Sequence, residues 1–117
     1  MFMALALWSF IGLISIVIFV HITSFVFGIL NDRFYSIFHI IGPILGVFFF
    51  HSFTENYFFA VILTVFLGIS WEIFEYCEWK FILKKKKYKP DPVDTRNDLA
   101  LDFLGSLIGV VILEFWI

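Results

Sequence analysis

The chain has 117 residues, of which 62% are hydrophobic and 18 are phenylalanine, and its mean hydropathy is +0.99. These values exclude an ordinary soluble globular domain, in which apolar and charged residues are more evenly balanced. The net charge is −2, and the single cysteine, Cys77, excludes an intrachain disulfide. At about 20 residues per span, the length allows roughly four membrane-spanning helices and almost no extramembrane domain.

The first two apolar runs predict two membrane helices. The first run, 5–30, ends at the polar breaker Asn31-Asp32-Arg33. The second run, 37–53, is short and contains Pro43, which suits a kinked helix packed inside a bundle. A turn at Thr54-Glu55-Asn56 separates it from the third run.

The third and fourth helices are predicted at 57–83 and 97–117, on either side of a basic cytoplasmic loop, 84–96. The two prolines of this loop, Pro90 and Pro92, predict an interruption of the helix there. The fold predicted from the sequence is therefore an all-α, integral membrane four-helix bundle, forming a single transmembrane domain over 1–117.

The positive charges predict the orientation of this bundle. All eight Lys and Arg residues are Arg33 or lie within 80–96. With four spans, both segments fall on one side of the membrane, which the positive-inside rule makes cytoplasmic. We therefore expect both termini outside, an N-out and C-out multi-pass topology.

Carboxylates at the cytoplasmic ends of the third and fourth helices are the main functional signal. Each charged side chain near the centre of a bilayer costs about 2.5 to 3.5 kcal/mol. Helical spacing places the acids of the third helix on one face, and those of the fourth within an arc of roughly 80°. Protons, histidines, Arg96 or a divalent cation could neutralise them. These acids are Glu72, Glu75, Asp94, Asp98 and Asp102.

A divalent cation is the interpretation that we favour, because intramembrane acids are functional by default. Carboxylate oxygens suit Mg²⁺ or Mn²⁺, and imidazole would admit Zn²⁺. The predicted metal ligands are the five acids with His21 and His39, and Glu72, Glu75 and Asp98 are the predicted catalytic residues. The alternative is protonated carboxyl groups that hydrogen-bond across helices.

The basic loop has two interpretations. It determines topology and attracts anionic lipid headgroups, or it holds the phosphate of a lipid substrate beside the acids. The predicted phosphate ligands are Arg96 with Lys84, Lys85, Lys86 and Lys87. Two GxxxG segments, 42–46 and 105–109, predict close helix packing or a homo-oligomer. No feature of the chain predicts a nucleic-acid site.

The last fifty residues carry a resemblance to known families. The pattern Gly68-x-x-Trp71-Glu72-x-x-Glu75, followed by Asp94-x-x-x-Asp98-x-x-x-Asp102-x-x-Gly105-x-x-x-Gly109, resembles the YjdF-like small inner-membrane proteins of bacteria and archaea. More distantly it is similar to the VanZ-like family, which is associated with glycopeptide-antibiotic resistance. The resemblance implies the cytoplasmic (inner) membrane of a prokaryote, and it implies no established activity.

Several functions therefore stay open. The first is a membrane protein that uses a carboxylate-bound divalent cation to act on a phospholipid or polyprenyl-phosphate headgroup. The second is cation or proton translocation, and the third is a structural, partner-binding subunit. Whether the protein is an enzyme is also open.

Overall fold

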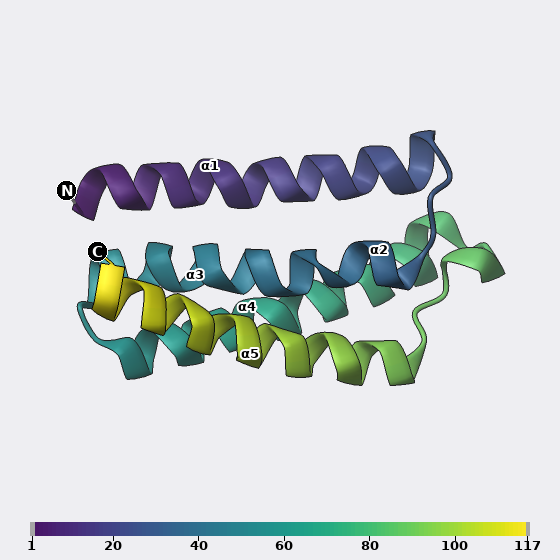
Figure 1. Cartoon of the computed structure of the whole chain (residues 1–117). Coiled ribbons are helices and arrows are strands. Elements are labelled where there is room, and N and C mark those ends of the chain that lie inside the picture. Colours follow the sequence, from purple (N-terminus) through teal and green to yellow (C-terminus); the bar gives the residue numbers. More distant parts are fainter. Residues whose placement is uncertain (1, 117) are drawn as a thin grey trace.

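The computed structural model describes residues 2–116 and confirms an all-α bundle (Figure 1). Four of its helices are long and apolar enough to cross a membrane. A π-helical turn extends α1 at Ile22–Val26 and another extends α4 at Trp79–Leu83, and a 3₁₀ turn covers Lys86–Tyr88. The helices are α1 (Phe2–His21), α2 (Asp32–Ser36), α3 (Phe38–Thr54), α4 (Tyr57–Glu78) and α5 (Pro92–Trp116).

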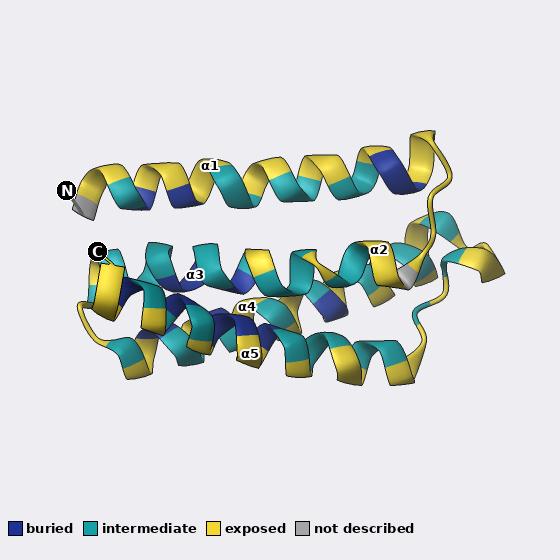
Figure 2. Cartoon of the chain, in the orientation of Figure 1, coloured by how far each residue is buried: buried dark blue, intermediate teal, exposed yellow. Residues whose placement is uncertain are grey.

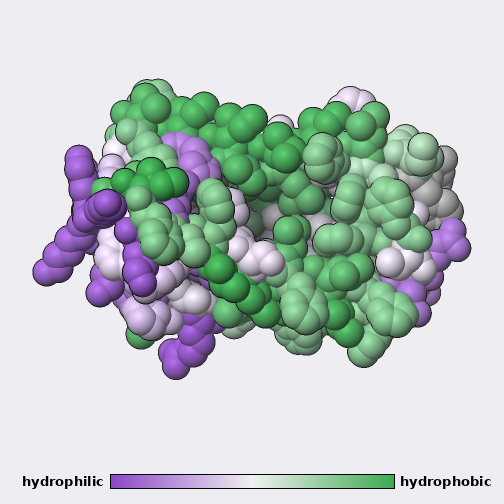
Figure 3. Space-filling model, turned by 180° about the vertical axis from the view of Figure 1, so that it is seen from behind, coloured by the Kyte–Doolittle hydropathy of each residue, from purple (hydrophilic) through white to green (hydrophobic). Residues whose placement is uncertain are grey.

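The long helices run antiparallel to their neighbours in sequence, and α3 packs against α1, α4 and α5 (Figure 1). Both ends of the chain lie with the α3–α4 turn at one end of the bundle. The α1–α2 link and the segment 84–91 lie at the other end, hereafter the loop end. Figure 3 shows an apolar belt between hydrophilic ends, with the larger hydrophilic group at the loop end. This arrangement puts the basic segments on one side, as four spans require.

The first helix ends earlier than the predicted 5–30. Gly28 adopts a left-handed conformation with φ +70, and the amide of Ile29 donates to the carbonyl of Thr23 at 2.9 Å. This glycine-terminated ending satisfies a free carbonyl of the last turn. The helical segment therefore stops at Val26, and 27–31 is a link to α2.

The fourth helix begins earlier than the predicted 97–117, because Pro92 starts it instead of blocking it. A proline is tolerated in the first turn, where its missing N–H has no helical acceptor. Asp91 caps this end, since its carboxylate accepts from the amide of Val93 at 3.0 Å. Residues 92–96 of the predicted loop are therefore helical, and the predicted end at Ile117 lies outside the described residues.

Small residues bring the helices close together. Buried positions gather where α3, α4 and α5 face one another, whereas most of α1 is exposed or half-buried (Figure 2). Gly105 and Gly109 of α5 lie against the backbone of α3 at Ile40 and Ile44. The α5 GxxxG thus packs helices within one chain, while a Cβ at Gly42 would meet nothing within 4 Å. Large apolar side chains point outward, as expected of a surface that faces lipid.

Candidate metal centre

His39 lies at the centre of the polar cluster near the loop end. It is on the first turn of α3, directly after the short helix α2, whose N-cap Asn31 accepts from the amide of Arg33. Its Nδ1 lies 3.0 Å from Oδ1 of Asp102 on α5. Its Nε2 lies 3.3 Å from Oδ2 of Asp98 and 4.0 Å from Oε1 of Glu72 on α4. One imidazole therefore faces three carboxylates from two other helices.

Two of these three acids, Glu72 and Asp102, are almost fully buried. The side chain of Glu72 is 7% exposed and that of Asp102 is 4% exposed. The absence of a side chain at Gly68 leaves room for the Asp102 carboxylate against α4. Among the described residues, Glu72 Oε1 and Asp102 Oδ2 have no hydrogen-bond partner. Such buried, unpaired oxygens are rare, because each forfeits its hydration.

The hydrogen bonds of this cluster determine which atoms can carry a proton. A carboxylate only accepts, so the Nδ1–H of His39 donates to Asp102. In a neutral imidazole the lone pair of Nε2 then faces the oxygens of Asp98 and Glu72. The point between the three groups therefore calls for positive charge, either protons or a cation.

The same three residues meet a geometric criterion for a metal site. One ligand atom each from His39, Glu72 and Asp98 can be chosen so that all lie within 4.8 Å of one another. Metal–ligand distances of about 2.0 to 2.2 Å bring the ligand atoms to roughly 3 to 4 Å from one another. Asp102, bonded to the far nitrogen of the imidazole, occupies the place of the carboxylate that orients a metal-bound histidine.

The remaining predicted metal ligands lie further out. Glu75 and Asp94 line a pocket of about 260 Å³ that opens from the cluster toward the loop end, and Glu72 and Asp98 line its base. Glu75 and Asp94 thus belong to the pocket and lie outside the His39 group.

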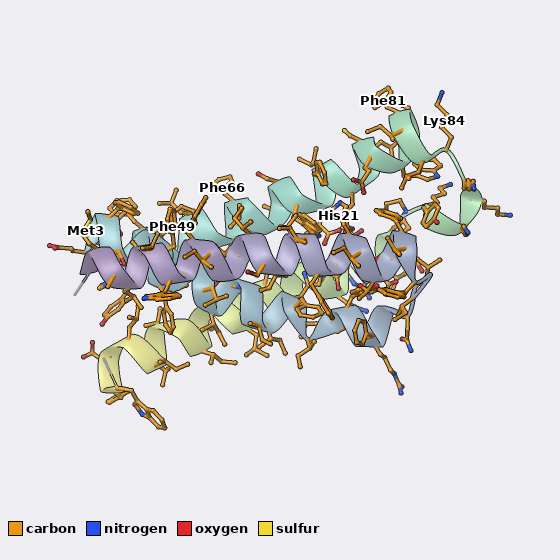
Figure 4. The ribbon with its side chains drawn as sticks, turned by 90° about the horizontal axis from the view of Figure 1, so that it is seen from above. Met3, His21, Phe49, Phe66, Phe81 and Lys84 are labelled. Carbon is orange, nitrogen blue, oxygen red and sulfur yellow. The ribbon has the colours of Figure 1, made fainter. Side chains whose placement is uncertain are left out.

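His21, also predicted as a ligand, is paired elsewhere. Its Nδ1 donates to the carbonyl of Val17 at 2.8 Å, and its Nε2 lies 3.1 Å from Oε2 of Glu78. Because Nδ1 already carries a proton, the second contact needs another proton between Nε2 and the carboxylate. Figure 4 shows His21 beside α4, while the π-helical turn that follows α4, with Phe81, and Lys84 after it diverge from α1. This pair ties the end of α1 to α4 beside the pocket.

Of the predicted phosphate ligands, the structure brings Lys87 to the pocket. Lys89, at the end of the same basic run, lines it as well, whereas Arg96 and Lys84 to Lys86 are not among the residues that line it. Lys87 Nζ lies 5.0 Å from the centre of the Tyr88 ring, and Lys89 Nζ lies 5.5 Å from that of Trp79. Arg96 lies between Asp94 and Asp98 in the sequence, but two residues from each it falls on the other side of α5 and is exposed.

Sequence reasoning also missed Glu78 and Tyr35. Glu78 is three residues from Glu75, so the acidic repeat 72, 75, 78 was a usable signal. Tyr35 lines the pocket, accepts from the hydroxyl of Ser24 at 2.9 Å and donates to the carbonyl of Ile29 at 2.6 Å. It depends on the α1–α2 link, and the sequence pattern contained no signal for it.

A family model described as a predicted membrane protein, DUF2238, matches residues 2–117. The chain belongs to this family. DUF2238 membership is consistent with the YjdF-like resemblance and extends it from the last fifty residues to the whole bundle. The VanZ-like resemblance is not shown by this match. No curated protein and no solved structure matches the chain.

Proposed function

We propose that this protein binds one divalent cation inside the membrane through His39, Glu72 and Asp98, with Asp102 orienting the imidazole. The observation that carries the proposal is the direction of His39 Nε2, which faces two carboxylates while Nδ1 is held by a third. An imidazolium would leave a net charge of −2 on this group. A divalent cation bound to neutral His39 would leave −1, which lowers the cost of burial further.

The ligand chemistry favours Mn²⁺ or Zn²⁺ over Mg²⁺. One imidazole nitrogen with two carboxylate oxygens is a borderline set, whereas Mg²⁺ prefers oxygen ligands and retained water. The pocket leaves one side of the site accessible from the loop end. An accessible coordination position is the feature that separates metal sites able to bind a substrate from purely structural ones.

We further propose that the pocket receives the phosphate-bearing headgroup of a phospholipid or polyprenyl phosphate. A bound cation at its base would polarise phosphoryl oxygens, and Lys87 and Lys89 at its rim add positive charge. We place the loop end in the cytoplasm of a prokaryotic inner membrane, which follows from the positive-inside rule. Anionic headgroups there also attract the lysines outside the pocket.

Cation or proton translocation receives less support. A path toward the opposite end would need free polar groups beyond Asp102. The buried hydroxyls of Ser9, Thr64 and Ser106 each donate to a carbonyl four residues earlier in their own helix. These hydroxyls are occupied by local bonds and offer no continuous relay.

Metal analysis of the detergent-purified full chain tests the proposal. We expect close to one Mn²⁺ or Zn²⁺ per chain, and a loss of affinity of at least tenfold in Glu72→Gln, Asp98→Asn and His39→Gln. Glu55→Gln, an exposed acid at the opposite end, is the matched control and should bind as the unchanged protein does. Absence of stoichiometric metal from the unchanged protein, after loading with each of the three cations, would rule the site out.

A further inference from the structure

The pocket beside the His39 group carries unpaired charges of both signs. Its lining includes six acidic side chains and two lysines. Within the described part of the chain, neither Lys87 nor Lys89 forms an ion pair with any of these acids. Opposite charges that line one pocket without pairing are available to a ligand.

Four of the six acids already have a role. Glu72 and Asp98 belong to the His39 group, Glu78 is paired with His21, and Asp91 caps α5. The two that remain without a cationic partner at ion-pair distance are Glu75 and Asp94. The pocket therefore presents two carboxylates and two ammonium groups that are not matched to one another.

A second observation concerns the base of this pocket. Glu72 lines the pocket and is 7% exposed, and its unpartnered oxygen, Oε1, faces Nε2 of His39 at 4.0 Å. A purely structural cluster would satisfy that oxygen with a side chain of the bundle. Glu72 thus belongs both to the His39 group and to the lining of the pocket.

From these charges we propose that the pocket binds a zwitterionic headgroup of the phosphoethanolamine class. The phosphate lies between Lys87 and Lys89, and the primary ammonium donates to Glu75 and Asp94. An anionic headgroup without an amine would leave both acids unpaired, and a quaternary amine could not donate hydrogen bonds to them. The inference rests on the proposed function for a phosphate-bearing headgroup in the pocket, and it is independent of the proposed cation.

Size and surroundings favour a lipid as the source of this group. The volume of about 260 Å³ lies below the range typical of drug-sized ligands and suits a single headgroup. Phe25, Leu30 and Leu83 line the same pocket, and the first two are 39% and 41% exposed. They give the attached glycerol and acyl chains an apolar exit into the bilayer.

Lipid binding to the delipidated, Mn²⁺-loaded full chain tests the inference by native mass spectrometry. We expect dioleoyl phosphatidylethanolamine to bind about tenfold more tightly than the phosphatidylcholine and phosphatidylglycerol analogues, since charge-assisted hydrogen bonds are lost with either. Soluble glycerophosphoethanolamine should compete weakly. Equal binding of the ethanolamine and choline lipids would overturn the proposal, and so would competition by the soluble compound at equal concentration.

Variants separate the two charges of the ligand. Glu75→Gln and Asp94→Asn should each abolish the preference for ethanolamine over glycerol, whereas Lys87→Gln with Lys89→Gln should weaken both lipids alike. Glu55→Gln is the control, and thermal unfolding in detergent verifies that each variant is folded. Retention of the ethanolamine preference in both acid variants would contradict the inference. If the chain binds no metal but keeps that preference, the metal proposal fails and this one stands.

Discussion

Gly68 of α4 lies directly against the carboxylate of Asp102 on α5, and a Cβ at this glycine would collide with it. The missing side chain therefore allows Asp102 to reach Nδ1 of His39. We expect Gly68→Ala to displace Asp102 and to weaken divalent-cation binding by about 10- to 100-fold, as loss of an orienting carboxylate does elsewhere. Isothermal titration of the purified protein with Mn²⁺ measures this.

Gly42→Ala is the matched control for that measurement. It places the same methyl group on a helix where nothing lies within 4 Å. If Gly68→Ala and Gly42→Ala bind the cation equally tightly, Asp102 has no orienting role.

Gly105→Ala should destabilise the bundle without any direct effect on the metal ligands. The added Cβ would lie 2.6 Å from the carbonyl oxygen of Ile40, a backbone atom that cannot rotate away. Overpacking of this kind costs about 1 to 3 kcal/mol. A fall in the midpoint of thermal unfolding in detergent, with Gly42→Ala close to the unchanged protein, is the expected result. An unaltered midpoint would show that α3 and α5 can separate freely.

Removal of the cation should loosen the loop end. The proposed ligands come from α3, α4 and α5, so a bound ion joins three helices. At 100 times its dissociation constant a ligand stabilises the folded state by about 2.7 kcal/mol. We expect EDTA to lower the midpoint of thermal unfolding of the unchanged protein. The midpoint of His39→Gln should not change. Equal sensitivity of both to the chelator would argue against this site.

His21 and Glu78 should behave as a coupled pair that holds α1 to α4. Their side chains are 29% and 17% exposed, so the contact is only partly screened by solvent. In a double-mutant cycle with His21→Ala and Glu78→Ala, we expect a coupling free energy of about 0.5 to 3 kcal/mol in the unfolding free energy. His21→Ala combined with Glu55→Ala, at the opposite end, should be additive. Additivity in both cycles would mean that the contact contributes nothing.

The single cysteine makes the orientation directly measurable. In a Cys77→Ser background, Glu55→Cys and Lys86→Cys place one thiol at each end of the bundle. The positive-inside rule predicts that a membrane-impermeant maleimide labels Glu55→Cys on intact cells and Lys86→Cys only after permeabilisation. The opposite pattern would reverse the proposed N-out, C-out topology.

The sequence was sufficient to predict the helices because lipid imposes a simple requirement. A backbone in hydrocarbon must satisfy its own hydrogen bonds, so long apolar runs become helices whatever their neighbours. The runs ending at Thr54 and Leu83 were therefore predicted closely. The ends at Gly28 and Pro92 were not, because they depend on one left-handed residue and one capping carboxylate.

The sequence also indicated that acids on α4 and α5 meet near the loop end, because helical periodicity places each set on one face. Only the tertiary structure decided which groups touch. The close approach of α5 to α3 puts His39 of α3 between Asp98 and Asp102, while His21 is turned to Glu78. Periodicity specifies a face of one helix, but the rotation and separation of two helices follow from packing at residues such as Gly68 and Gly105.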